Sequence, residues 1–271
     1  MELILNEHAF AQQAIACGTV GKKPAQTLGC ISRYLCQEGY EKPQIEATLH
    51  QFMQEHYADY HAVQWDAAIG RISSRADARP LLQAEQIEIT RGELARIRAL
   101  ASQPLERLCF TLLCLAKYAQ LINPANEGWV TQKWSAIFRM AHVQAGKEKR
   151  AAMLHALREK GLIAFSRGVD NLHIHVLFFC PSSQTACALD DLREPGLFYL
   201  SLQGERIIRC ACCGKFLKPK TNNQKYCPDC RAEMNLKKTL ARYHAAAFWF
   251  RTRLIVPRNP RSCWVFRGIL F

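Results

Sequence analysis

Four of the thirteen cysteines lie in two CxxC pairs near the C-terminus. Cys210 and Cys213 form the first pair, and Cys227 and Cys230 form the second. A structural Zn²⁺ takes four ligands in a tetrahedron, and each CxxC turn can direct two thiolates at one ion. The spacing therefore predicts a four-cysteine site with one Zn²⁺ per chain. Because protein would fill all four positions, we expect the ion to be structural rather than catalytic.

A redox pair is the alternative interpretation of these cysteines. The thioredoxin-type CxxC motif is expected once, at a βαβ junction, so the doubled pair favours a metal. Cys212 is a fifth cysteine that cannot easily share one tight turn with Cys213, and we expect a spare or buried thiol there. The first residues lack the basic and apolar regions of a signal peptide. A reducing, cytoplasmic compartment is therefore expected, where clustered cysteines more often hold metals than form disulfides.

The residues around the cysteines indicate a small finger over residues 205–248. Gly214 suits a tight turn after the first pair, and residues 215–226 are long enough for a hairpin with Asn222 and Asn223 at its turn. After Cys230 the leucines recur at helical spacing. A second CxxC pair at the start of a helix is typical of a treble-clef zinc finger, and a ribbon-like finger is the related possibility.

Positive charge is concentrated in two segments of the chain. The net charge is +13; residues 205–271 carry +12 and residues 128–180 carry +5, while the other residues are slightly acidic. This distribution is typical of a protein that meets a polyanion with its C-terminal half. A merely solubilising charge run is the alternative. The candidate phosphate contacts of the finger are its lysines: Lys215, Lys218, Lys220, Lys225, Lys237 and Lys238.

The elements that precede the finger have a recognisable order over residues 90–180. Thr90 and Glu93 match a capping box at the start of a helix that reaches about Ala101. The pattern next predicts an apolar helix over 104–122, a short strand at GWV, helices over 131–140 and 147–160, and a β-hairpin over 162–179. This is the order of a winged helix, in which the second helix of the pair enters the DNA major groove.

One face of the helix over 147–160 is expected to meet nucleic acid. Met153, Leu154 and Leu157 form its core side, so the opposite side is free to contact a ligand. Flanking cations would bind phosphates and His155 would read bases, whereas Arg167 is the candidate at the wing tip. The same fold also serves as a protein–protein module, so it does not settle the function. The candidate contacts of this segment are Lys147, Lys149, His155, Arg158 and Arg167.

Two histidines alternate in the second strand of this hairpin. His173 and His175 therefore share one face, and a metal site could begin in that way. We favour an outward face of the wing, because Leu172, Ile174 and Val176 supply an apolar inward face. No further carboxylate cluster near them in the sequence supports an enzyme.

The two ends of the chain differ in character. Residues 1–80 predict a helical bundle with an opening helix over Glu2–Ala16 and helices that begin near Pro24 and Pro43, where proline suits a first turn. Its apolar faces are the candidate contact for a homodimer or a protein partner. Residues 249–271 lack periodicity and acidic residues, so we expect an irregular basic tail, with a nucleic-acid arm as the alternative. No run of about 18 apolar residues occurs, and no membrane span is expected.

Four segments of the chain also carry a resemblance. KPAQTLGCISRYLCQEGY, GWVTQKWSAIF, LREKGLIAFSRGVDNLHIHVLF and CCGKFLKPKTNNQKYCPDC together resemble a group of largely uncharacterised proteins of bacteriophages and mobile elements of Gram-positive bacteria. The resemblance covers about residues 1–243 and is most specific in the cysteine segment. It implies the cytoplasm of a bacterium or a phage-infected host and a zinc finger, and it implies no reaction.

The sequence thus predicts a mainly α fold with a helical bundle, a winged helix with a hairpin wing, and a four-cysteine zinc finger. We expect a non-enzymatic zinc protein that binds double-stranded DNA and acts in replication or transcription control of a phage or mobile element. The alternative is an RNA-binding or protein-recruiting adaptor that uses the finger as a docking surface. A nuclease would require metal-dependent cleavage, which we do not expect.

Overall fold

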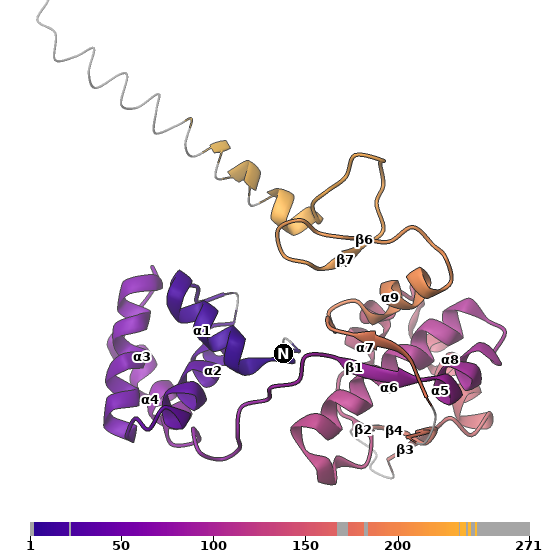
Figure 1. The fold of residues 1–271 in the computed structure, drawn as a ribbon, viewed down its shortest axis with the longest axis horizontal. Helices are drawn as coiled ribbons and strands as arrows, with labels where there is room; N and C mark the ends of the chain where they lie inside the picture. Colours follow the sequence, from indigo (N-terminus) through magenta and orange to yellow (C-terminus); the bar gives the residue numbers. More distant parts are fainter. Residues whose placement is uncertain are drawn as a thin grey trace, which may run out of the picture.

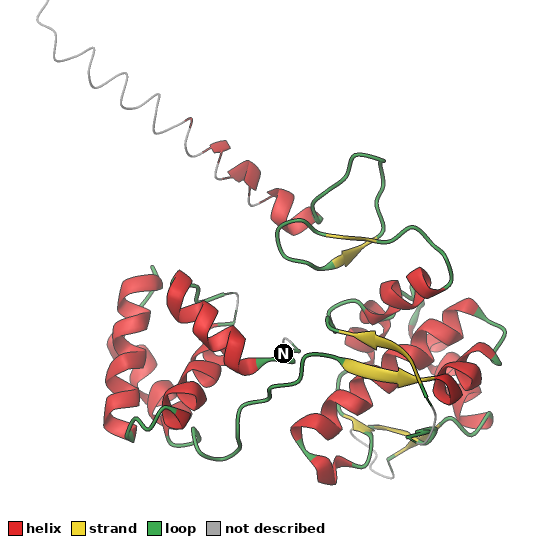
Figure 2. Ribbon diagram, in the orientation of Figure 1, coloured by secondary structure: helices red, strands yellow, loops and turns green. Residues whose placement is uncertain are grey.

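The computed structural model describes residues 3–21, 23–166, 173–181, 184–232, 234–236, 238–239 and 242. In these residues the protein is mainly α-helical, and its short strands form three small sheets (Figures 1 and 2). The N-terminal helices enclose one hydrophobic core and the central elements enclose a second, larger one. Among the residues that the structure describes, no helix combines the length and apolar composition that a membrane crossing requires.

Four helices build the N-terminal bundle. Their core contains Leu28, Leu49 and Ile69, none of which is exposed to solvent. Helix α2 has proline in its first turn, as the sequence predicts. The helices are α1 (Glu7–Cys17), α2 (Pro24–Gln37), α3 (Lys42–His56) and α4 (Ala62–Ser73).

The opening helix starts later than the sequence predicts, at Glu7 rather than Glu2. Asn6 caps it by accepting a 2.8 Å hydrogen bond from the N–H of Ala9. The residues before the cap are extended because they pair with the chain that leaves the bundle: Ala84 donates to the carbonyl of Leu5 over 3.1 Å. A partner that is distant in the sequence therefore sets the start of α1.

The buried carboxylate of Glu7 joins this helix to the segment after α4. It accepts hydrogen bonds from Arg33 at 2.8 Å, from Arg79 at 2.6 and 2.8 Å, and from the N–H of Leu82 at 3.0 Å. Burial raises the pKa of Glu7, but the hydrogen bonds from Arg79 and Leu82 and the charge of Arg33 outweigh it and leave the pKa below its ordinary value.

Glu7→Gln is expected to lower the free energy of unfolding at neutral pH by about 1–2 kcal/mol, because neutral hydrogen bonds replace charge-assisted ones. Since the folded-state pKa of Glu7 lies below the ordinary 4.5, this stabilisation is present above that pH and is lost as the pH falls through the lowered value. Urea unfolding from pH 7 to pH 3 measures the difference. The difference in the free energy of unfolding between the wild-type protein and Glu7→Gln should shrink below pH 4.5. Glu85→Gln, at an exposed position, is the control and should leave the free energy of unfolding unchanged. A Glu7→Gln difference that stays constant with pH would contradict the assignment.

The central core is arranged around one long apolar helix, α6 (Gln103–Ile122), in which Phe110 is fully buried. Before it lie β1 (Ile87–Thr90) and α5 (Arg91–Arg98). The predicted capping box is confirmed, because Thr90 accepts from the N–H of Glu93 and Glu93 accepts from the N–H of Thr90. Helix α5 ends at Arg98, short of the predicted Ala101, which has a positive φ of 49°.

A helix pair and a three-stranded sheet follow α6. The helices are α7 (Trp134–Met140), which begins later than the predicted residue 131, and α8 (Lys147–Glu159). Strands β3 (Ile163–Phe165) and β4 (Ile174–Val176) form the predicted antiparallel hairpin. The short strand β2 (Trp129–Val130) pairs with the other side of β4, so the sheet order is β2-β4-β3.

The side chains of these elements separate into a core side and an outer side. Leu154 and Leu157 of α8 are fully buried, as the periodicity predicts, and Met153 is nearly so. His175 lies on the outer face of the sheet, where its ring stacks on Trp129 at 4.5 Å between centroids. Ile174 and Val176 point into the core. Leu172 and Arg167, which the sequence assigns to the wing, lie outside the described residues.

Two elements that sequence patterns did not predict complete the central core. Strand β5 (Thr185–Leu189) pairs antiparallel with β1, and α9 (Pro195–Leu202) packs on α6. Tyr199 of α9 donates a 2.8 Å hydrogen bond to the buried carboxylate of Glu106 on α6. The finger that follows contains β6 (Ile208–Arg209) and β7 (Phe216–Leu217), shown beyond α9 in Figure 1.

Candidate metal centre

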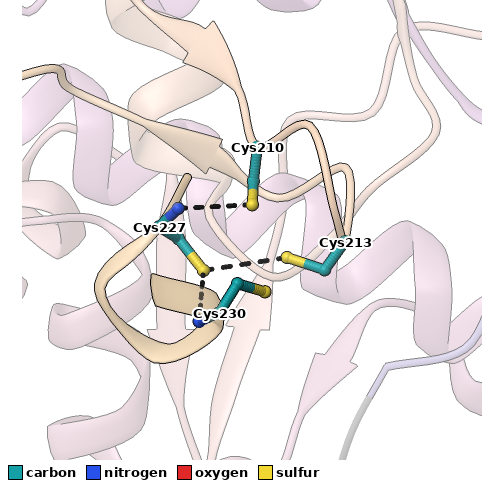
Figure 3. A group of neighbouring side chains, drawn as sticks. All are labelled: Cys210, Cys213, Cys227 and Cys230. Carbon is teal, nitrogen blue, oxygen red and sulfur yellow. Dashed lines mark hydrogen bonds between the residues drawn. The ribbon is translucent and has the colours of Figure 1, made fainter. Parts of the chain in front are cut away.

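The four cysteines of the two CxxC pairs converge on one point (Figure 3). All four Sγ atoms lie within 4.8 Å of one another, and the sulfurs of Cys213 and Cys227 are 3.8 Å apart. A tetrahedral ion with metal–sulfur bonds of about 2.3 Å places its ligands about 3.8 Å from each other. The thiol groups therefore fit one tetrahedral metal ion.

Backbone N–H groups hold the sulfurs in this arrangement. Cys227 donates to the Sγ of Cys210 over 3.2 Å, and Cys230 donates to the Sγ of Cys227 over 3.4 Å. Burial raises the pKa of the Cys210 thiol, but hydrogen bonds from neighbouring N–H groups, that of Cys213 first, outweigh burial and lower the pKa below its ordinary value. Burial and the neighbouring thiols raise the pKa of Cys213 and Cys230.

The first CxxC turn lies between the two strands of the finger. Strands β6 and β7 pair Ile208 with Leu217, and the turn between them closes with a 2.9 Å hydrogen bond from Gly214 to the carbonyl of Cys210. Gly214 has a φ of +71°, a conformation that a glycine adopts at little cost. Asn222 and Asn223 lie at a turn, as expected, but the predicted hairpin around them is wrong, because β6 and β7 pair on either side of the first CxxC pair and residues 218–227 form no strand.

The second CxxC pair meets a helix, as the sequence predicts. Residues 228–232 are helical, and Cys230 lies within this turn. Cys210, Cys227 and Cys230 are buried, Cys213 is half-buried, and Cys212 is exposed and outside the group of four. The arrangement fits a structural metal ion, because four protein sulfurs leave no open position for water or substrate.

The finger contacts the central core at α9 and at the residue Arg193 just before it. Phe216 of β7 is buried in that core, 5.5 Å from the ring of Phe198 on α9. Arg193 donates to the carbonyl of Cys213 over 2.6 Å and also pairs with Asp191. The metal site is thus anchored to the helical core by a backbone carbonyl of one of its own ligand residues.

Glu194, at the N-terminus of α9, contacts both the finger and the turn between α7 and α8. It pairs with Lys215 of the finger and with His142 in the turn between α7 and α8. Burial raises the pKa of Glu194, but hydrogen bonds from these two partners lower it below its ordinary value. Sequence patterns gave no sign of Arg193 or Glu194, since each acts through a partner that is distant along the chain.

The candidate nucleic-acid contacts fall into three groups. Those on α8, namely Lys147, Lys149, His155 and Arg158, are all exposed, but helical spacing places Lys147 and Lys149 on opposite flanks of the solvent side. In the finger, Lys215 and Lys218 form ion pairs with Glu194 and Glu205, which makes them weaker candidates than the sequence indicates. Lys220, Lys225 and Lys238 are exposed, whereas Arg167 and Lys237 lie outside the described residues.

Comparison with known proteins adds no relative from which a function could be transferred. No protein-family model matches the chain, and neither the curated proteins nor the solved structures yield a match.

Proposed function

We propose that this protein is a non-enzymatic DNA-binding protein in which a winged helix meets the duplex and a four-cysteine zinc finger is a structural element. The observation that carries the proposal is the topology of residues 103–176, together with the exposed cations on the flanks of α8. Replication or transcription control in a phage or mobile element of a bacterium is the setting that the resemblance suggests.

The order of elements supports the winged helix. Helix α6, strand β2, helices α7 and α8, and the hairpin β3–β4 follow one another, and the sheet order β2-β4-β3 places the first strand beside the last. In a helix-turn-helix protein the second helix of the pair lies in the major groove while its partner crosses the backbone. Here α8 buries Leu154 and Leu157 toward α6, so its other side is available to a duplex.

The charges on α8 suit a contact with phosphates. Lys147 and Lys149 are exposed in its first turn, where the free N–H groups of a helix also attract anions. Glu148, between them, and Glu159, at the end of the helix, offset part of this charge. Arg158 and His155 lie nearer the wing strand β3, where both contact Phe165. Lysines and arginines on phosphates fix the position of a protein on DNA, and base reading falls to other side chains such as His155.

Zinc is the ion that the ligand set favours. Four thiolates in a tetrahedron suit zinc or iron rather than magnesium or calcium. Zinc with four protein ligands carries out no chemistry, which agrees with a non-enzymatic role. Its contribution is to fold the finger and hold it against α9.

A duplex-binding assay tests this function. Replacing Lys147 and Lys149 together by alanine should reduce the slope of log affinity against log salt by about two, one for each lost phosphate contact. The matched control removes two exposed cations of the bundle, Lys42 and Arg71, and should leave the slope unchanged. Anisotropy titrations with a labelled duplex over a range of salt concentrations give both values.

Two outcomes would overturn the proposal. If the full-length, zinc-loaded protein leaves duplex DNA unbound at low salt, the RNA-binding or protein-recruiting adaptor becomes the better interpretation. If the control pair lowers the slope as much as the α8 pair does, binding is diffuse and α8 is not the contact. Degradation of the duplex that depends on divalent metal would instead indicate a nuclease.

A further inference from the structure

A hollow of about 480 Å³ lies between α8 and the first wing strand. Its volume is within the range of small-ligand sites. Aromatic rings and one arginine dominate its lining, and none of the described residues that line it is an aspartate or glutamate. The lining residues are Trp134, His155, Arg158, Ala164, Phe165 and Ser166.

Phe165 is the lining residue that contacts the other rings and the arginine, and we call this hollow the Phe165 pocket. The ring of His155 meets Phe165 edge-on, 5.4 Å between centroids, and the ring of Trp134 is tilted toward it at 6.2 Å. The guanidinium carbon of Arg158 lies 5.7 Å from the Phe165 centroid. Three rings from three different elements, α7, α8 and β3, therefore surround one space with a cation at its edge.

This chemistry selects a flat, anionic ligand. Aromatic side chains stack on planar rings, and Arg158 can pair with a negative charge or stack as well. A cationic ligand such as a methylated lysine would meet Arg158 without any acidic side chain in the lining, so repulsion disfavours it. A planar ring that carries a phosphate, which is a nucleotide, satisfies both properties.

The position of the pocket indicates which nucleotide it can reach. It is lined by two exposed residues of α8, His155 and Arg158, and by β3, the strand that leads into the wing. Bases within a duplex are stacked on their neighbours and cannot enter a side pocket, whereas an unpaired base can stack on aromatic residues whatever its identity. Building on the proposed function, we propose that the Phe165 pocket takes one unpaired nucleobase of a DNA end or junction, with its phosphate on Arg158.

Binding of tailed and blunt duplexes tests the pocket. The full-length, zinc-loaded protein is titrated with two labelled duplexes of one sequence, blunt or with a short single-stranded tail. The wild-type protein should prefer the tailed duplex by roughly tenfold, the effect of one stacked base. Phe165→Leu and Trp134→Leu, which keep an apolar side chain but remove a ring, should reduce this ratio to about one.

Trp129→Leu is the matched control, because Trp129 stacks on His175 of β4 and does not line the pocket. It should keep the preference for the tailed duplex. A wild-type protein that binds blunt and tailed duplexes equally would overturn the pocket while leaving the proposed function intact. Failure to bind either duplex would instead overturn the proposed function itself.

Photocrosslinking keeps the inference testable if the leucine variants fail to fold. A tail that contains 5-iodouracil is irradiated in complex with the wild-type protein, and the crosslinked peptides are identified by mass spectrometry. Crosslinks to Trp134, His155 or Phe165 support the pocket. Crosslinks confined to the finger or the N-terminal bundle would overturn it.

Discussion

Cys227→Ser is expected to lower the metal content from about one ion per chain to almost none. Cys227 takes part in most of the contacts that assemble the centre: its sulfur lies 3.8 Å from that of Cys213, and its N–H donates to the sulfur of Cys210. A serine hydroxyl is a poor replacement for a soft thiolate ligand. Because metal binding and folding are coupled in such small units, the loss is large; structural zinc in finger peptides contributes about 10–16 kcal/mol.

Elemental analysis of the purified protein measures this result, and substitution with Co²⁺ reports the thiolate ligands by absorbance. Cys212→Ser is the matched control one residue from a ligand, and it should keep the ion because Cys212 is exposed and outside the group of four. A Cys227→Ser protein that retains a full ion would refute the site. One iron per chain in place of zinc would keep the centre but refute the choice of metal.

The loss should extend beyond the finger itself. Phe216 contacts Phe198 of α9, and the carbonyl of Cys213 accepts from Arg193 just before α9, so an unfolded finger removes both contacts with the central core. We therefore expect proteolysis first within residues 205–232 and a lower melting temperature for the remaining domain. The metal in this interpretation holds two parts of the molecule together.

Local signals in the sequence were enough for much of the fold. The capping box of Thr90 and Glu93, proline in the first turn of α2, and the buried side of α8 each depend on residues within a few positions of one another. The two CxxC pairs are also a local signal, because one tight turn fixes the spacing of the two ligands within each pair. These features follow from backbone geometry and need no knowledge of distant contacts.

Long-range partners account for what the sequence did not show. Strand β5 is defined by its pairing with β1, which lies almost a hundred positions earlier, and its own pattern is short and mixed. Helix α9 is nearly uniformly apolar, so no amphipathic face marks it as a helix. Likewise, the ion pair of Lys215 with Glu194 joins two segments whose approach the sequence does not specify.

Gly196→Ala is expected to destabilise the protein by about 3 kcal/mol, the upper end of the usual effect of overpacking. Gly196 lies in the first turn of α9, where an added Cβ would come within 2.3 Å of the carbonyl oxygen of Ala141 and 2.4 Å of its carbonyl carbon. These are backbone atoms of Ala141, the residue that follows α7, so no side chain can rotate away. Either α9 or the turn between α7 and α8 must move.

Thermal and urea unfolding measure this loss, and Gly70→Ala in α4 is the control. There the new Cβ meets only Glu46, at an ordinary 3.9 Å, so the change should stabilise the helix by up to about 1 kcal/mol through propensity alone. Equal stabilities for Gly196→Ala and the wild-type protein would mean that α9 does not lie against the end of α7.

The same substitution separates two roles for α9. Glu194, two residues before Gly196, pairs with His142 beside α7 and with Lys215 in the finger, so a displaced α9 should loosen both contacts. If α9 serves only the core, the Gly196→Ala protein should lose stability but keep its metal and its duplex affinity. If α9 joins the finger to the α7–α8 pair, duplex affinity should fall as well, at a temperature where the protein is still folded and the metal still bound. Anisotropy titrations and metal analysis on one preparation distinguish these results.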